Sequence, residues 1–192
     1  MITYELESNL YINMTNRCSN NCEFCIRNSK EHYLSHYNLW LDKEPIYEDF
    51  LDEIRDKDIN KYNEIVFCGY GEPTYRLDLM QQIAEYFKGK KRRLNTNGQG
   101  NLINGRDIVP ELSEFIDTVS ISLNASDNKE YQKKCKSIYE NAFDEVIDFA
   151  KKCVENNIET RFTVVEGCVE NMDLAREVAE KNGIEFFVRE LI

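Results

Sequence analysis

The sequence has no apolar run long enough to cross a membrane and no stretch that resembles a secretion signal. Its first seven residues include Glu5 and Glu7, whereas a signal peptide begins with basic residues and continues into an apolar segment. The sequence also has no linker rich in proline, glycine or serine, no internal repeat and no low-complexity segment. We therefore expect a cytoplasmic protein whose 192 residues form a single domain, residues 1–192, with a core of its own.

Positive charge is scarce, since 24 lysines and arginines face 35 aspartates and glutamates and the net charge is −11. A surface of this sign makes nucleic acid an unlikely partner, although the total charge leaves room for a small basic pocket. Cysteine, by contrast, is plentiful, with seven in the chain. In a reducing compartment, cysteines at this frequency indicate metal or redox chemistry rather than disulfides.

Apolar segments with strand-like and helix-like periods alternate along the chain. Strands are predicted at residues 9–15, 63–68, 91–95, 117–123, 158–165 and 184–190, and helices at residues 45–56, 77–89, 107–116, 138–156 and 170–182. The helix at 138–156 has the clearest period, with Ile138, Ala142, Val146, Ala150 and Val154 recurring at four. Such alternation indicates parallel βαβ units. A closed eightfold barrel typically needs about 250 residues. The chain is shorter, so we expect an α/β fold with an open, mostly parallel six-stranded sheet, a partial (β/α)6 barrel.

Three cysteines follow the first predicted strand at C-x3-C-x2-C spacing, namely Cys18, Cys22 and Cys25. No fourth cysteine or histidine lies at short range, whereas a structural zinc site normally has four protein ligands. A [4Fe–4S] cluster held by three cysteines would keep one iron open to a small molecule. The spacing favours this cluster, and a zinc knuckle or plain structural thiols are the alternatives.

Polar or glycine residues stand where the other predicted strands end. In parallel βα folds, functional groups cluster at the carboxyl ends of the strands. These positions hold Gly69-Tyr70-Gly71-Glu72-Pro73, Asn95-Thr96-Asn97-Gly98, Ser120 with Ser122 and Asn124, Arg161 with Thr163 and Glu166, and Arg189 with Glu190. One active-site mouth at this edge of the sheet is therefore predicted.

Together these motifs resemble the radical S-adenosylmethionine (SAM) superfamily, and in particular the group called TatD family-associated radical SAM proteins. The shared stretches are residues 10–18, 66–73, 95–99 and 119–125. In the superfamily, the open iron of the cluster binds the amino and carboxylate groups of SAM. The resemblance implies a [4Fe–4S] cluster on Cys18, Cys22 and Cys25, in a radical SAM core domain without an auxiliary-cluster domain.

The resemblance also implies the residues that bind SAM. Glu72 and the backbone of Gly69 to Gly71 would hold its ammonium group, with Tyr70 inserted in the family's Gly-Gly-Glu-Pro element. The fuller G-x-I-x-G-x-x-E pattern of the family's fifth strand is absent. The other implied contacts are Phe24 over the adenine, Asn95 and Asn97 after the third strand, Ser122 and Asn124 at the ribose and carboxylate, and the backbone from Arg161 to Val165 along the adenine.

The implied reaction needs a one-electron reductant such as flavodoxin or ferredoxin. SAM would be cleaved to methionine and a 5′-deoxyadenosyl radical, which takes hydrogen from a small-molecule or peptide substrate that the sequence does not identify. Such a cluster is expected to be oxygen-sensitive. Two other classes stay open, namely an activating enzyme that installs a radical on a partner protein and a non-catalytic iron–sulfur or zinc protein.

Four further features are weighed apart from these motifs. Cys68 is a candidate hydrogen-atom donor or an ordinary buried thiol. His32 and His36 are expected to be solvated or near the substrate. The segment 28–44 is long for a βα connection, and we expect it to cover part of the mouth. Arg189 is expected to meet a carboxylate or phosphate of the substrate.

Overall fold

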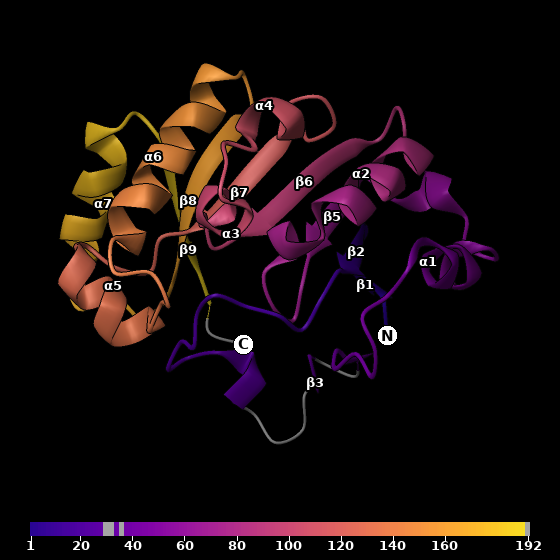
Figure 1. The fold of residues 1–192 in the computed structure, drawn as a ribbon, viewed down its shortest axis with the longest axis horizontal. Helices are drawn as coiled ribbons and strands as arrows, with labels where there is room; N and C mark the ends of the chain where they lie inside the picture. Colours follow the sequence, from indigo (N-terminus) through magenta and orange to yellow (C-terminus); the bar gives the residue numbers. More distant parts are fainter. Residues whose placement is uncertain (29–32, 35–36, 191–192) are drawn as a thin grey trace.

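The computed structural model describes residues 1–28, 33–34 and 37–190, drawn as a coloured ribbon in Figure 1. Its main sheet has seven strands in the order β1-β2-β5-β6-β7-β8-β9. These are β1 (Thr3–Leu6), β2 (Asn9–Asn13), β5 (Glu64–Cys68), β6 (Lys91–Thr96), β7 (Thr118–Ser122), β8 (Glu159–Val165) and β9 (Glu185–Arg189). All neighbours from β2 to β9 are parallel, and β1 pairs antiparallel with β2. The predicted open, mostly parallel α/β sheet is confirmed, with one strand more than expected.

The additional strand, β1, forms a hairpin with β2 across a turn in which Glu7 has a φ of 53°. The Glu53 carboxylate of α1 (Tyr47–Ile54) accepts the backbone N–H of Ile2 at 3.0 Å and that of Thr3 at 2.7 Å. These tertiary contacts fix a strand of only four residues. A segment this short and acidic carries too little periodicity to be recognised from the sequence alone.

Helices lie along one side of the curved sheet, with α6 and α7 beside β8 and β9 and with α2 over β5 and β6 (Figure 1). The remaining α-helices are α2 (Leu77–Tyr86), α3 (Gly100–Asn104), α4 (Val109–Leu112), α5 (Asn128–Cys135), α6 (Ala142–Glu155) and α7 (Met172–Lys181). Short 3-10 turns are η1 (Ile26–Asn28), η2 (Ile59–Lys61) and η3 (Pro73–Arg76), and β3 (Tyr33–Leu34) pairs with β4 (Tyr37–Asn38) in a small hairpin. In the part of the chain that the structure describes, no helix combines the length and hydropathy needed to span a bilayer.

Two predicted helices differ from the observed ones. The helix expected at 107–116 reduces to the single turn α4. The helix expected at 138–156 begins only at Ala142, because α5 ends at Cys135 and the next residue, Lys136, has a left-handed φ of 48° that directs the chain away from a helical path. Ile138 therefore lies outside the helix and is 68% exposed, and Val154 near the end of α6 is 47% exposed, so the prediction that these two residues share the buried face is wrong. The mostly polar α5 was not predicted, since its sequence has little apolar periodicity.

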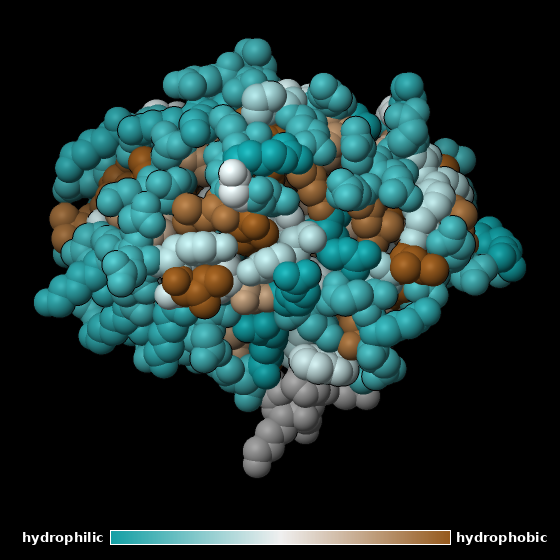
Figure 2. All heavy atoms as spheres, in the orientation of Figure 1, coloured by the Kyte–Doolittle hydropathy of each residue, from teal (hydrophilic) through white to brown (hydrophobic). Residues whose placement is uncertain are grey.

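The hydrophobic core lies between the helices and the sheet. Phe149 and Val146 of α6 are buried with Val119 and Ile121 of β7 in a single continuous cluster. Figure 2 shows a largely hydrophilic outer face with apolar residues scattered among polar ones, which suits a chain with 31% charged residues. Since the helices occupy one side of the sheet, the strands are left to present their other side chains to the opposite side, where the candidate site lies.

Candidate active site

A cavity of about 610 Å³ opens beside the carboxyl ends of the strands. All of the residues for which the sequence predicts a cluster or SAM contact line it: Cys18, Cys22, Phe24, Cys25, Gly69, Tyr70, Gly71, Glu72, Asn95, Asn97, Ser122, Asn124, Arg161 and Val165. A second hollow of about 400 Å³, which includes Tyr47 of α1 and Leu77 of α2, contains none of them. Residues from distant parts of the sequence thus converge on one volume, and what they bind is taken up below.

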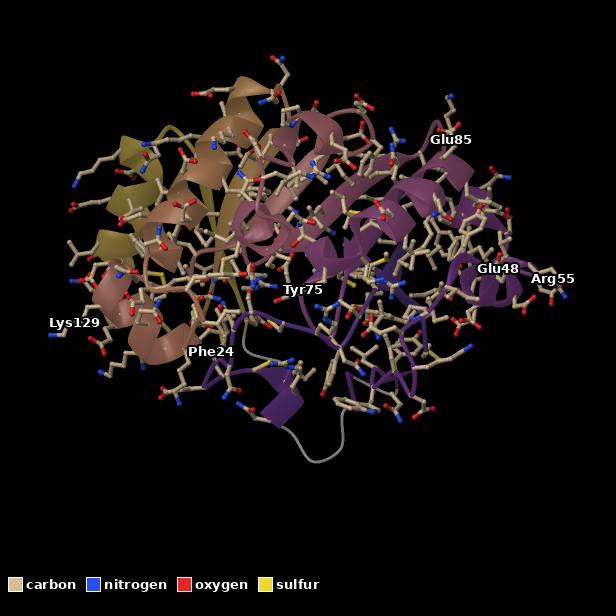
Figure 3. All side chains as sticks on the ribbon, in the orientation of Figure 1. Phe24, Glu48, Arg55, Tyr75, Glu85 and Lys129 are labelled. Atoms are coloured by element: carbon tan, nitrogen blue, oxygen red, sulfur yellow. The ribbon has the colours of Figure 1, made fainter. Side chains whose placement is uncertain are left out.

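The cysteine loop is fastened to the end of α5. The backbone N–H of Asn21 donates to the carbonyl of Cys135 at 2.9 Å, and that of Glu23 donates to the carbonyl of Lys134 at 3.0 Å. Within the loop, the Arg27 guanidinium donates to the carbonyl of Asn16 at 2.9 Å and to that of Asn20 at 3.0 Å. Phe24 extends from this loop below α5 (Figure 3). The thiols therefore stand on a braced loop rather than on a free one.

The three loop thiols are half-buried and differ in their surroundings. Burial raises the pKa of Cys18 to about 12. A hydrogen bond with the Cys135 thiol lowers the pKa of Cys22. Among the described residues, no three His, Cys, Asp or Glu side chains are gathered as they would be around a single metal ion. All three loop cysteines line the cavity, and three thiolates are the protein ligands that a [4Fe–4S] cluster with one open iron takes.

A buried hydrogen-bond network of two amides and a phenol holds the cysteine loop against the rest of the fold. The Asn20 amide donates to the Tyr131 hydroxyl at 3.1 Å, and the Gln99 amide donates both to that hydroxyl and to Asn20 Oδ1, each at 2.8 Å. Asn97 donates to Ser19 Oγ at 2.9 Å. None of the side chains of Asn20, Gln99 and Tyr131 was singled out from the sequence. Their spacing carries no motif, and only the fold brings them together.

Gly71 allows two chain segments to pack against each other. A Cβ built on Gly71 would lie 2.0 Å from the carbonyl oxygen of Arg17, a distance that no side chain tolerates. The Gly71 N–H donates to the carbonyl of Thr15 at 2.8 Å, and the Tyr70 N–H donates to Asn13 Oδ1, also at 2.8 Å. Because these N–H groups are engaged within the protein, the polar backbone groups that the segment can present to a ligand are carbonyl oxygens, which act as acceptors.

Glu72 is 2% exposed and accepts four hydrogen bonds from the protein. Its Oε1 accepts the backbone N–H of Thr74 at 3.1 Å, the Thr74 hydroxyl at 2.8 Å and the Thr96 hydroxyl at 2.7 Å, while Oε2 accepts the Asn97 N–H at 2.7 Å. Burial raises the pKa of this carboxyl, and the same hydrogen bonds oppose the rise. The carboxylate predicted to hold the SAM ammonium thus also connects the 69–73 segment to the end of β6 through its hydrogen bonds.

The later strands contribute polar groups in a regular ladder. Asn95, Ser120 and Arg161 are paired in register across β6, β7 and β8. Beyond them, Asn124 adopts a positive φ of 49°, and its Oδ1 accepts the backbone N–H of Val165 at 3.0 Å. This contact places Asn124 and Val165 together at the cavity wall.

The cavity is also lined by residues for which the sequence predicted no contact with the cluster or with SAM. Cys135 reaches the cavity although its position in the sequence suggested no cluster role. Cys68 is buried with its thiol 3.3 Å from the Tyr4 hydroxyl, and burial raises its pKa to about 11. Leu39 lines the cavity and the neighbouring Trp40 meets Tyr70 edge-on at 6.2 Å, so part of the 28–44 segment does lie beside the mouth. His32 and His36 lie outside the described residues.

Comparison with known proteins assigns the chain to a family. The profile of the radical SAM superfamily matches residues 12–181, so the chain belongs to this superfamily. The comparison with curated proteins finds no match.

Solved structures share the fold. A radical SAM methyltransferase from Sphaerobacter thermophilus aligns with a TM-score of 0.63 at 12% identity over 98% of this chain and 68% of that one. Native anSMEcpe with bound AdoMet aligns with a TM-score of 0.66 at 17% identity over 95% of this chain and 50% of that one. The hydrogenase maturase HydG from Carboxydothermus hydrogenoformans aligns with a TM-score of 0.63 at 16% identity over 96% of this chain and 44% of that one. The chain thus spans between 44% and 68% of the lengths of these proteins.

Superfamily membership identifies the chain as carrying a radical SAM domain, the kind of domain that uses a [4Fe–4S] cluster and SAM as cofactors. The site fits both groups, because three thiols, a buried carboxylate and the polar strand ends face one cavity of adequate size. Its reaction with a substrate is not defined by the family.

Proposed function

We propose that Cys18, Cys22 and Cys25 hold the cluster and that SAM lies between the cysteine loop, the 69–73 segment and the ends of β6 to β8. The single observation that carries this proposal is the convergence of these groups on one cavity. The stretches quoted above support placing the chain near the TatD family-associated radical SAM proteins. The same proposal includes a cytoplasmic location and a flavodoxin-like or ferredoxin-like electron donor.

The residues around the cluster site would lower the cost of its negative charge. The backbone N–H of Asn20 lies 3.4 Å from Cys18 Sγ, and the Asn97 amide lies 3.9 Å from it. Hydrogen bonds to a ligating sulfur stabilise its thiolate form and adjust the potential of the bound group. Phe24 covers the same wall of the cavity and would limit the access of water.

The residues around SAM would hold its polar groups at fixed points. Glu72 and the carbonyl oxygens of the 69–73 segment are acceptors for the ammonium. Ser122 and Asn124 are placed to meet the ribose and carboxylate, and the β8 backbone near Val165 to lie along the adenine. When bound, the two cofactors supply reductive cleavage of SAM to methionine and a 5′-deoxyadenosyl radical that abstracts hydrogen from the substrate.

The test is the electron paramagnetic resonance spectrum of the reconstituted, reduced protein, recorded with and without SAM under anaerobic conditions. Because SAM would bind the open iron, its addition should change the signal of the reduced cluster. In Cys22→Ser the signal of a site-bound cluster should be absent. A reduced cluster whose spectrum SAM leaves unchanged would show that SAM does not bind at the cluster.

An activating enzyme for a partner protein remains the second candidate, because the sheet is open beside the cavity. Phe187 and Val188 of the edge strand β9 are 44% and 46% exposed and both line the cavity. A partner chain seated there could receive the radical directly. Co-purification of a stoichiometric partner that acquires an organic radical signal after SAM cleavage would favour this candidate over a small-molecule enzyme.

A further inference from the structure

Three arginines line the candidate active-site cavity from three strands of the main sheet. Arg93 of β6, Arg161 of β8 and Arg189 of β9 all line it, in a chain whose net charge is −11. The strands β8 and β9 lie side by side at the end of the sheet opposite β1 (Figure 1). The predicted SAM ammonium and carboxylate contacts come mainly from the 69–73 segment and from β6 and β7. The cavity therefore has a wall lined by three guanidinium side chains, none of which is among the side chains proposed above to contact SAM.

Uncharged neighbours position the two arginines nearest the sheet edge. Arg161 Nε donates to Ser120 Oγ at 3.4 Å, and its guanidinium lies over the Phe187 ring at 5.2 Å from the centroid. Arg189 Nη2 donates to Ser122 Oγ at 3.3 Å. Each of these hydrogen bonds uses one of the several N–H groups of a guanidinium. The contacts orient the two side chains without neutralising them.

Acidic partners are few on this wall. Arg93 forms an ion pair with Glu64 at 2.8 Å, but among the described residues no carboxylate lies within ion-pair distance of Arg161 or Arg189. The carboxylates that line the cavity are Glu72, which is committed to its own four donors, and Glu190 next to Arg189 in the chain. Desolvation and the like charges of Arg93 and Arg161 lower the pKa of Arg189. Converging guanidiniums repel one another unless an anion joins them.

We propose that Arg161 and Arg189, supported by Arg93, bind an oxyanion of the substrate, so that the substrate class is a molecule bearing a carboxylate or phosphate group. The proposal rests on the proposed function, since it places this anion in the cavity that also holds SAM. A guanidinium has a planar fork that matches either oxyanion, which explains arginine rather than lysine at these positions. The resemblance to the family concerned the backbone of β8, so a substrate role for the Arg161 side chain is compatible with it.

The test titrates inorganic phosphate, and separately acetate, into the anaerobically reconstituted protein by calorimetry, with chloride matching the ionic strength. Each titration is run without SAM and with saturating SAM, because the carboxylate of SAM is the competing occupant of the arginines. The variants are Arg161→Gln, Arg161→Lys and Arg189→Gln. The matched control is Arg176→Gln, because Arg176 of α7 also lies over a β9 ring, Phe186 at 4.8 Å, but does not line the cavity. Iron content, SAM affinity and melting temperature are measured on every sample.

Wild-type protein should bind at least one of the two anions whether SAM is present or not, and the stronger ligand identifies the class. Arg161→Gln and Arg189→Gln should each weaken binding roughly tenfold or more, Arg161→Lys by less, and Arg176→Gln by no measurable factor. The proposal is overturned if neither anion binds, if saturating SAM abolishes the binding, or if Arg176→Gln weakens it equally. If the wild-type protein did not bind SAM, the proposed function itself would be refuted. Failure of the anion site and failure of the proposed function are therefore distinguishable.

Discussion

The charged side chains at the two ends of the cavity differ in how far the protein itself satisfies them. At the end that faces the cysteine loop, Glu72 is buried and accepts four hydrogen bonds from the protein itself. At the other end, Arg161 and Arg189 touch serine hydroxyls, and no carboxylate among the described residues pairs with either of them. In our proposal, Glu72 both binds SAM and stabilises the fold, whereas Arg161 and Arg189 keep their charge available for a substrate. The difference predicts which substitutions cost stability and which cost only binding.

The largest expected effect concerns the cysteine loop. Replacing Cys18, Cys22 or Cys25 with alanine should remove nearly all of the about four iron and four sulfide that reconstituted wild-type protein binds. Each thiolate supplies one of the three protein ligands, and the loop offers no close substitute. Cys153→Ala is the matched control, because this fully buried cysteine of α6 lies in the core away from the cavity. If all three loop variants retained their iron, the cluster would have to be bound by other residues.

Next in size is the effect of Glu72→Ala on stability. The substitution leaves buried donors of Thr74, Thr96 and Asn97 without their acceptor, so the free energy of unfolding should fall by about 3 kcal/mol. SAM affinity should fall as well. Thr74→Val removes one donor and keeps the carboxylate, so it should cost less than half as much. Chemical denaturation of the metal-free protein measures both values, and an unchanged midpoint for Glu72→Ala would contradict the double role of this residue.

A smaller effect is expected for Glu5, a carboxylate outside both ends. Hydrogen bonds from Lys61 and Tyr62 lower the pKa of Glu5 to about 2. A lowered carboxyl pKa stabilises the folded state above the unfolded value of 4.5, and this stabilisation is lost as the pH falls from 4.5 towards 2. Since water screens this group, Glu5→Gln should cost only about 0.5–1 kcal/mol at pH 7.

The measurement for Glu5 is the difference in unfolding free energy between wild type and variant across the acid range. The difference should shrink as the pH falls. Glu85→Gln is the control, because Glu85 is labelled on the outer surface in Figure 3 and its exposed carboxylate forms an ion pair with Lys88, which follows the end of α2. A difference for Glu5→Gln that grows on acidification would have the wrong sign.

The smallest stability effect should come from Arg161→Gln. Removing one of several like charges relieves repulsion, so the free energy of unfolding should stay within about 0.5 kcal/mol of the wild-type value. If Arg161→Gln lowered the free energy of unfolding as much as Glu72→Ala, Arg161 would have a structural role. The proposed difference between the two ends of the cavity would then be wrong. Thermal and chemical unfolding of the two variants side by side decide this point.

Many of the residues that line the cavity could be predicted from the sequence, because they belong to local motifs. The cysteine spacing, the Gly-x-Gly-Glu-Pro turn and the polar strand ends all follow strands whose apolar runs are clear, and the parallel topology then brings them together. Glycine is required at Gly71 for a reason that only the structure supplies, namely the approach of the Arg17 carbonyl.

Features that depend on long-range contacts could not be predicted in this way. The strand β1 depends on Glu53, about fifty residues away, and the support of the cysteine loop depends on Tyr131 and Gln99. Helix boundaries failed where polar segments fold by packing, as in α5, or where a left-handed residue such as Lys136 interrupts an apolar pattern. That residues 1–192 form a radical SAM core without an auxiliary-cluster domain stays a prediction.

The most direct test of the central claim is the product of SAM under strong reduction. Anaerobically reconstituted wild-type protein, treated with dithionite and SAM, should release 5′-deoxyadenosine and methionine in equal amounts, measured by liquid chromatography and mass spectrometry. Cys22→Ala should release neither above background. Wild-type protein that carries stoichiometric zinc without sulfide and forms no 5′-deoxyadenosine would contradict the assignment of this cavity to radical SAM chemistry.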